Sequence, residues 1–453
     1  MDNVRSSARV DSEIAGCLAS GQWPRLERLI SSFDTQGMPG RQGFKSFVSA
    51  CAAWELGRLA DALCLISEAR RLLPFHDKLR VTEIRWLLLL GRLDEALVLS
   101  AELDSEVGPV GESRYILGTI YLRLGRFSEA QSAFDRALNC GVQPDPSRML
   151  PSPVVTPARL LHDYKQLEYL LSLTIVDTSF TNELAFLRNQ AHTLFGFDTA
   201  DIGGLERVRA EQAGVLSPES LASLSRIYKR VVRLEHSECP ENAIGIDSRF
   251  GRAESQFFES TPNCRFAVVD DFLSPEALAS LRAYMFRSWI WLNDAQKGFA
   301  YVGAYEHNGF RAPIIDRIDA QLTRALPKLL DGLTLSQVWS YRNVLGHTAV
   351  GTHADFAKIN INFWITDEKY NLEPESGGLL IHPIERPEGW EFERYNGDDE
   401  EINKLVSGSS PTRIPFKTNR AVIFDSKLFH ASDRSVFLAE HEGFRTNVTF
   451  LYD

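Results

Sequence analysis

The sequence lacks the features that mark secreted and membrane proteins. Its six cysteines form no C-x-x-C pair, and four of them fall within helical, apolar segments. We therefore expect reduced core cysteines rather than disulfides or a zinc site. The first 16 residues contain no apolar core of the kind that a signal peptide requires. The longest strongly apolar run, Trp86 to Leu90, is far shorter than the roughly 20 residues that span a bilayer. These absences predict a cytoplasmic protein without a membrane partner.

An excess of positive charge is also missing. The 453 residues include 49 Lys and Arg against 60 Asp and Glu, which gives a formal net charge of −11. Proteins that bind nucleic acid or anionic membranes non-specifically draw their affinity from basic surfaces. We therefore do not expect a nucleic-acid partner. The composition, with 44% hydrophobic and 24% charged residues, is ordinary for a globular chain. The length allows about two or three domains.

Three near-copies of one motif recur in the first third of the chain. They begin at Gly57, Gly91 and Gly125, so the period is 34 residues both times, and each has an alanine five positions later. The glycine can end a helix in a left-handed conformation, and the alanine lets two helices approach closely. The period and the small residues resemble tetratricopeptide repeats, which are stacked helix–turn–helix units. We predict three stacked antiparallel helix pairs between about 40 and 142, within a repeat domain over 1–144.

The stretch 145–262 shows helical periodicity without a repeat. Several prolines mark a break at its start, and Ala158 to Leu173 then places apolar residues on or near one helical face. Further helices are expected at 181–195 and 217–234. We expect a helical linker region. It either packs the repeats against the C-terminal part or serves as a mobile connector.

Short β segments dominate from Leu335 onwards. An earlier strand-like segment, 266–272, is followed by a helix start at Ser274 and Pro275. The later segments, with no helix between most of them, are 336–344, 358–366, 378–382, 420–425 and 445–452. This pattern predicts an antiparallel barrel or jelly roll. The expected fold class is α+β and multidomain, with an α-helical repeat solenoid followed by a double-stranded β-helix over 263–453.

His353, Asp355 and His430 are the candidate metal ligands. Residues two apart in an extended chain point to the same side, so His353 and Asp355 can present an imidazole and a carboxylate to one point. His430, from another expected strand, would complete one face of an octahedron. Two histidines and one carboxylate, with the opposite face open, form the ligand set of non-haem iron(II) oxygenases. We predict that these three residues are both the metal ligands and the catalytic residues.

Three further features surround this pattern. A strand over 358–366 follows at once, Ser376 to Leu380 makes a tight turn into another strand, and Arg445 lies 15 residues after His430. Residues 265–453 resemble the 2-oxoglutarate oxygenase superfamily, and within it the prolyl-4-hydroxylase-like branch. The resemblance implies an Fe(II)- and 2-oxoglutarate-dependent dioxygenase that uses O2, with ascorbate as a further candidate cofactor.

The same resemblance suggests how the co-substrate is bound. In that family a basic residue after the distal histidine binds the remote carboxylate of 2-oxoglutarate, and Arg445 matches by position. A dianionic acid inside a barrel requires a buried cation, and arginine offers a bidentate fork. Tyr341 resembles the family's hydroxyl partner for this acid. Alternatively, Arg445 is a surface arginine and Tyr341 is an ordinary core tyrosine. Arg342 or Arg420 would then hold the acid. Candidate inward-facing contacts for the co-substrate are Asn362 and Asn447.

The resemblance implies hydroxylation of a C–H bond coupled to decarboxylation of 2-oxoglutarate to succinate. Asp355 argues against halogenation, since related halogenases lose this carboxylate to make room for chloride. Helical-repeat superhelices bind extended segments in a groove, so the expected substrate is a peptide or protein side chain. One alternative is a small-molecule metabolite as substrate, with the repeats used for oligomerisation as a homodimer. The other is a non-catalytic repeat scaffold with a degenerate oxygenase domain.

An acidic stretch from Glu385 to Glu401 interrupts the strands. It contains eight Asp and Glu residues. A solvated face is the simpler interpretation. The more specific interpretation is a lid that recognises a basic or amine-bearing substrate and is anchored by Trp390 and Phe392.

Overall fold

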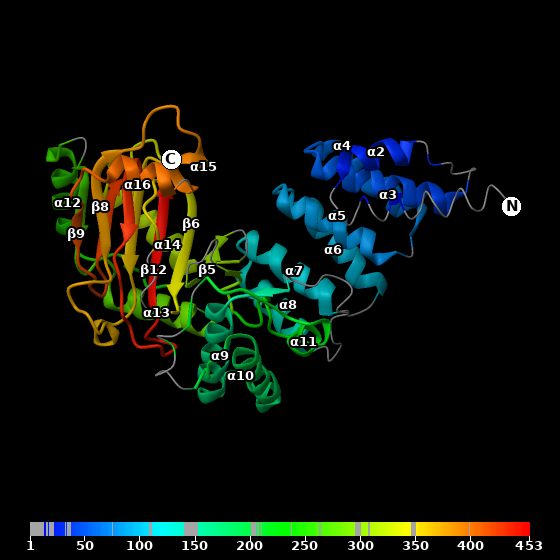
Figure 1. The fold of residues 1–453 in the computed structure, drawn as a ribbon, viewed down its shortest axis with the longest axis horizontal. Helices are drawn as coiled ribbons and strands as arrows, with labels where there is room; N and C mark the ends of the chain where they lie inside the picture. The colour runs from blue at the N-terminus through cyan, green and yellow to red at the C-terminus, as the bar shows by residue number, and fades with distance from the viewer. Residues whose placement is uncertain are drawn as a thin grey trace. The chain divides into compact units, whose positions relative to one another are not determined.

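A computed structural model describes most of the chain (Figure 1). Outside the described residues are 1–12, 15–16, 18–21, 32, 34–37, 75, 108–110, 140–152, 201–204, 206–207, 210, 237, 262–263, 295–299, 307–308, 346–349 and 398. The chain forms two compact units, Met1–Val142 and Gln143–Asp453. The expected domain boundaries at 144 and 262 lie outside the described residues. None of the helices within the described ranges combines the length and apolarity that a membrane crossing requires.

The first unit is helical. Its helices are α2 Trp23–Ser31, α3 Pro39–Glu55, α4 Leu59–Leu72, α5 Asp77–Leu89, α6 Leu93–Val107, α7 Gly111–Arg123 and α8 Phe127–Asn139. Helices α3 and α4, α5 and α6, and α7 and α8 form the three pairs predicted from the repeat, and each pair packs on the next. Gly57, Gly91 and Gly125 lie between the helices of a pair with φ of 76°, 72° and 71°. A side chain at that φ costs energy that glycine avoids, which explains why the glycine recurs.

The alanines of the motif lie where two helices of a pair meet. Ala62, Ala96 and Ala130 are fully buried. A single apolar cluster of buried residues extends from α3 into α7, and stacked rings of Trp54 and Trp86, 4.6 Å between centroids, join neighbouring pairs. The repeats therefore share one continuous core, as a solenoid requires.

In its described residues, the second unit combines helices with three antiparallel sheets: a two-stranded sheet of β1 and β2, a large sheet and a small sheet. Its helices are α9 Pro157–Ser172, η1 Thr178–Phe180, α10 Thr181–Phe195, α11 Pro218–Ser223, α12 Asp247–Glu259, α13 Pro275–Arg287, α14 Pro313–Ala325, η5 Glu368–Tyr370, α15 Phe392–Gly397 and α16 Asp399–Val406. Its strands are β1 Val154–Val155, β2 Gly214–Val215, β3 Phe266–Val269, β4 Asn293–Asp294, β5 Tyr301–Tyr305, β6 Leu335–Asn343, β7 Ile359–Trp364, β8 Leu379–Glu385, β9 Thr412–Ile414, β10 Ala421–Asp425, β11 Leu428–Ser432 and β12 Arg445–Tyr452.

One of the expected helices is wrong. The helix expected over 217–234 ends at Ser223, and the chain then forms turns in which Lys229 has a φ of 53°. The apolar residues Ile227, Val231 and Val232 of this segment are nevertheless buried. Burial of a turn segment can produce an apolar pattern like that of a helix, and these β-branched residues have low helix propensity.

The large sheet has the strand order β3-β10-β7-β12-β6-β5-β4, and the small sheet has the order β11-β8-β9. In the described residues, neighbouring strands of both sheets run antiparallel. One face of the large sheet shares an apolar core with the small sheet, to which Trp364, Phe424 and Leu428 contribute. We call this the inner face. Helices cover the other face, where α12 packs on β3 and β10 and α9 packs on β5.

Candidate functional site

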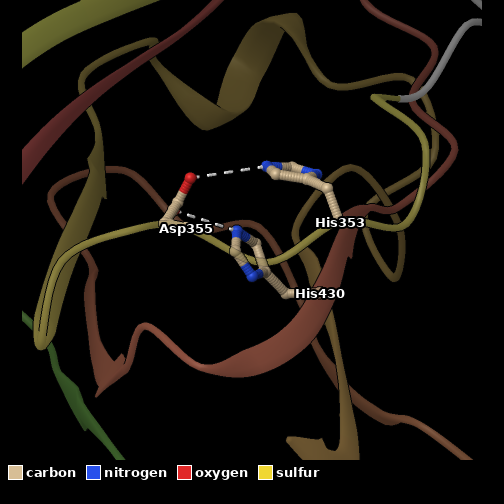
Figure 2. A group of neighbouring side chains, drawn as sticks. All are labelled: His353, Asp355 and His430. Carbon is tan, nitrogen blue, oxygen red and sulfur yellow. Dashed lines mark ion pairs between the residues drawn. The ribbon is translucent and has the colours of Figure 1, made fainter. Parts of the chain in front are cut away.

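The side chains of His353, Asp355 and His430 converge (Figure 2). One ligand atom from each lies within 4.8 Å of those of the other two. His353 Nε2 is 3.9 Å from Asp355 Oδ1, and His430 Nε2 is 3.5 Å from Asp355 Oδ2. The structure therefore brings together the three residues that the H-x-D…H pattern singled out. Of the three side chains, His353 is the most exposed, at 20%, and the other two are buried.

The local backbone around His353 differs from the expected strand. His353 and His430 form an isolated bridge, in which each backbone N–H donates to the other residue's carbonyl at 2.9 and 2.8 Å. The regular strand β7 begins only at Ile359. The reason lies in the topology. His353 pairs with β11 of the small sheet, whereas Ile359 pairs within the large sheet, so the chain crosses between sheets and cannot keep one ladder.

Backbone carbonyls fix the orientation of both imidazoles. His353 Nδ1 lies 2.8 Å from Gly351 O, and His430 Nδ1 lies 3.0 Å from Leu428 O. A carbonyl only accepts, so each Nδ1 carries a proton, and each Nε2 faces Asp355 as the ring atom available to a metal. Burial, together with the nearby His353, lowers the pKa of His430 to about 4, and the negative charge of Asp355 opposes that shift. His430 is therefore a neutral imidazole at physiological pH, which is the form that binds metals.

Asp355 is oriented by a residue that the sequence reasoning missed. The Asn360 amide donates to Asp355 Oδ2 at 2.7 Å, and Asn360 is 1% exposed. Asn360 stands two residues before Asn362 in an otherwise apolar strand, so both asparagines point to the inner face. That repeated polar residue was the available signal in the sequence.

Arg445 lies on the inner face of β12 and is buried. Its Nε and Nη2 atoms donate to the carbonyls of Gly377 and Gly378, the latter at 3.0 Å. A Cβ on Gly378 would lie 1.8 Å from Ile414 O, so only glycine fits this tight turn. Within the part of the chain that the structure describes, Arg445 Nη1 has no hydrogen-bond partner, and the guanidinium carbon lies 5.7 Å from the Trp364 ring centroid.

The charge state of Arg445 follows from its surroundings. Burial lowers its pKa to about 10, and the negative charge of Asp433 opposes that shift. Arg445 is therefore still a cation at neutral pH. Arg342 points to the opposite, helix-covered face, where its Nη2 donates to His441 O at 2.6 Å. Arg420 is paired with Asp270, with Nε to Oδ1 at 2.6 Å. Arg445 thus differs from Arg342 by lying on the inner face, and from Arg420 by having carbonyls rather than a carboxylate as its hydrogen-bond partners among the described residues.

Tyr341, Asn362 and Asn447 share the inner face with Arg445. Register pairs Asn447 with Tyr341 on β6 and with Trp364 on β7, and paired residues of neighbouring strands point to the same side. The amides of Asn362 and Asn447 donate to Thr449 Oγ1 at 2.9 and 3.2 Å. Asn362 and Asn447 are therefore linked through the hydroxyl of Thr449.

Tyr341 belongs to a small aromatic group. Its hydroxyl lies 3.0 Å from the Tyr305 hydroxyl, and the rings of Tyr301 and Tyr341 are 4.5 Å apart between centroids. Burial, with the charge of Asp355 as a smaller contribution, raises the pKa of Tyr341 well above its ordinary value. Tyr341 is therefore a neutral hydroxyl at physiological pH.

No protein-family model matches the chain, and no curated protein matches it in sequence. Solved structures with partial likeness include MamA 41-end from Desulfovibrio magneticus RS-1, at 13% identity and a TM-score of 0.27, covering 42% of this chain and 94% of that one. They also include the non-heme alpha ketoglutarate dependent epimerase SnoN from nogalamycin biosynthesis, at 9% identity and a TM-score of 0.33, covering 46% and 83%. A 2OG-Fe(II) oxygenase family oxidoreductase from Burkholderia pseudomallei is 10% identical with a TM-score of 0.28, covering 48% and 94%. Such likeness identifies no activity for this chain.

Proposed function

We propose that the second unit is an iron(II)- and 2-oxoglutarate-dependent dioxygenase that hydroxylates a C–H bond. The observation that carries this proposal is the convergence of His353, Asp355 and His430, with both Nε2 atoms facing the carboxylate. Two imidazoles and one carboxylate can occupy one face of an iron(II) ion and leave the opposite positions open. The two antiparallel sheets that flank these ligands agree with a double-stranded β-helix.

The residues present fit a divalent cation. Asp355 is buried, and its hydrogen-bond partner is the neutral amide of Asn360. The imidazole of His430 beside it is neutral, and a buried carboxylate without a compensating cation is costly in a low-dielectric site. A divalent ion bound by His353, Asp355 and His430 would compensate that charge.

The inner face also fits an anionic co-substrate. Arg445 is a buried cation whose bonded partners are carbonyls, and its Nη1 is not used by the described residues. The nearby Trp364 Nε1 is likewise buried without a partner among them. Arg445 would hold the remote carboxylate of 2-oxoglutarate, with Tyr341 and Asn447 beside it. When bound, iron and 2-oxoglutarate would supply the oxidising chemistry with O2 as the oxidant: one oxygen atom would enter succinate, formed with CO2 from the co-substrate, and the other would enter the hydroxylated product. The chain orients both groups and excludes water from the site.

The proposed substrate is a peptide or protein side chain. Supporting this are the three helix pairs of the first unit, since stacked helical repeats commonly bind extended segments. The test measures succinate released from 2-oxoglutarate by the full chain with Fe(II), in the presence of peptide pools or of small metabolites. Stimulation by peptides supports the proposal, and stimulation by metabolites alone would move the substrate to the small-molecule class. No 2-oxoglutarate turnover under any condition would favour a non-catalytic scaffold.

A further inference from the structure

The connection between β8 and β9 is unusually long. These strands are antiparallel neighbours, with Leu379 paired to Ile414, and such hairpins normally need only about two to five linking residues. Here residues 386–411 intervene, and they include α15 and α16. We call residues 386–411 the insert. It contains most of the acidic stretch, and the described side chains Glu388, Glu391, Glu393 and Glu400 are exposed.

The insert contacts the residue between the first two candidate ligands. The Ala354 N–H donates to Tyr395 O at 3.0 Å, and the Asn396 amide donates to Ala354 O at 3.1 Å. Both backbone polar groups of Ala354 are thus satisfied by two consecutive residues of α15. Ala354 itself is fully buried. The peptide units that join His353 to Asp355 therefore depend on α15 for their orientation.

The insert also contacts the residues that adjoin the other ligand positions. Arg386 Nη2 donates to the carbonyl of Phe356, which follows Asp355, at 3.4 Å. Phe429, which precedes His430, is fully buried against the insert. Its ring centroid lies 6.4 Å from that of Trp390. One apolar cluster joins these parts, with the buried members Ala354, Tyr395, Ile402, Val406 and Phe429.

We infer that the insert positions the metal ligands, and that Asn396 is the side chain through which it holds the His353–Asp355 segment. This inference rests on the proposed function. The segment lies where the chain crosses between sheets. Among the described residues, the sheet backbone supports it through the isolated bridge at His353 and through the Asp355 N–H, which donates to Ser426 O at 3.0 Å. The hydrogen bonds from the insert to Ala354 give this segment the support that regular strand pairing does not provide. Groups that orient metal ligands from behind commonly change metal affinity about 10- to 100-fold when removed.

The test compares three variants of the full chain. Asn396→Ala removes the donor to Ala354 O, and Asn396→Asp removes it while keeping the shape of the side chain. Asn403→Ala is the matched control, because Asn403 is an exposed asparagine of α16. Co(II) is titrated anaerobically into each variant at a temperature well below the midpoint of that variant's thermal unfolding. The dissociation constant and the visible spectrum of bound Co(II), which reports ligand geometry, are both recorded.

We expect both Asn396 variants to bind Co(II) about tenfold more weakly or worse and with an altered spectrum. Asn403→Ala should match the unmodified chain in both readouts. Unchanged affinity and spectrum in the Asn396 variants would overturn the inference, while leaving the proposed metal site intact. Absence of Co(II) binding by the unmodified chain would instead overturn the proposed function, so the two failures are distinguishable.

Discussion

The amide of Asn360 donates a 2.7 Å hydrogen bond to Oδ2 of Asp355, and both residues are buried. The bond selects one orientation of the carboxylate, with Oδ1 toward His353 and Oδ2 toward His430. Because Asn360 comes from β7, it ties the crossing segment that carries Asp355 to the large sheet. The candidate metal site is thus held by β7 on one side and, in our inference, by the insert on the other.

We predict that Asn360→Ala weakens divalent metal binding about 10- to 100-fold, because the carboxylate loses its orienting donor. Isothermal titration calorimetry with Mn(II) measures the change. Asn362→Ala is the matched control, since Asn362 lies on the same strand and face but bonds to Thr449. Equal losses in both variants would contradict a specific role for Asn360.

We predict that Arg445→Leu weakens 2-oxoglutarate binding by about 2 to 5 kcal/mol, because it removes one partner of a buried charge pair. Metal binding should persist, since Arg445 is not a proposed ligand. Arg434→Leu is the control, because the Arg434 side chain is 64% exposed. Anaerobic titration of 2-oxoglutarate into the metal-loaded variants gives both affinities. If Arg445→Leu kept full affinity, the co-substrate would have to be held elsewhere or be a different acid.

The middle stretch belongs to the second unit, and α9 shows why its removal should be damaging. Twelve of its 16 residues are buried. Arg159 is 1% exposed and pairs with Asp294 of β4 at 2.6 Å, and the Gln166 amide donates to Ser288 O at 2.7 Å. We predict that a fragment 143–453 unfolds cooperatively, whereas a fragment 263–453 does not fold. Thermal unfolding followed by near-UV circular dichroism distinguishes them. A cooperative transition of 263–453 would instead support residues 145–262 as a helical linker region.

His441 makes stability depend on pH. Burial and the positive charge of Arg342 lower its pKa well below the ordinary value. Below about pH 6.5 the His441 imidazole is therefore protonated in the unfolded chain but stays neutral in the folded chain. The free energy of unfolding should consequently fall as the pH drops below about 6.5. Glutamine does not titrate, so His441→Gln should reduce the dependence of the unfolding free energy on pH by the equivalent of up to one bound proton. Denaturant unfolding of the metal-free protein at several pH values measures this dependence. His236→Gln, at an exposed position, is the control. An unchanged slope in His441→Gln would contradict the assignment.

Features that depend on residues close together in the sequence were predictable from the sequence. The repeat placed three helix pairs correctly because each glycine and alanine acts within one pair, and the β segments from 336 onwards are strands. His353, Asp355 and His430 were found because chemistry limits which side chains can share a metal. The crossing of the chain between sheets at His353 and the early end of α11 were not predictable, since both depend on distant packing. The same holds for the contact from Asn396 to Ala354, which joins residues 42 positions apart.

The central claim is that His353, Asp355 and His430 form one metal site that also binds 2-oxoglutarate. The most direct measurement is an anaerobic calorimetric titration of Fe(II), followed by 2-oxoglutarate, into the unmodified chain and into Asp355→Ala. We predict one Fe(II) per unmodified chain and 2-oxoglutarate binding only after the metal is loaded. Asp355→Ala should lose both while keeping its thermal unfolding transition. Full Fe(II) binding by a folded Asp355→Ala variant, or no binding by the unmodified chain, would contradict the claim.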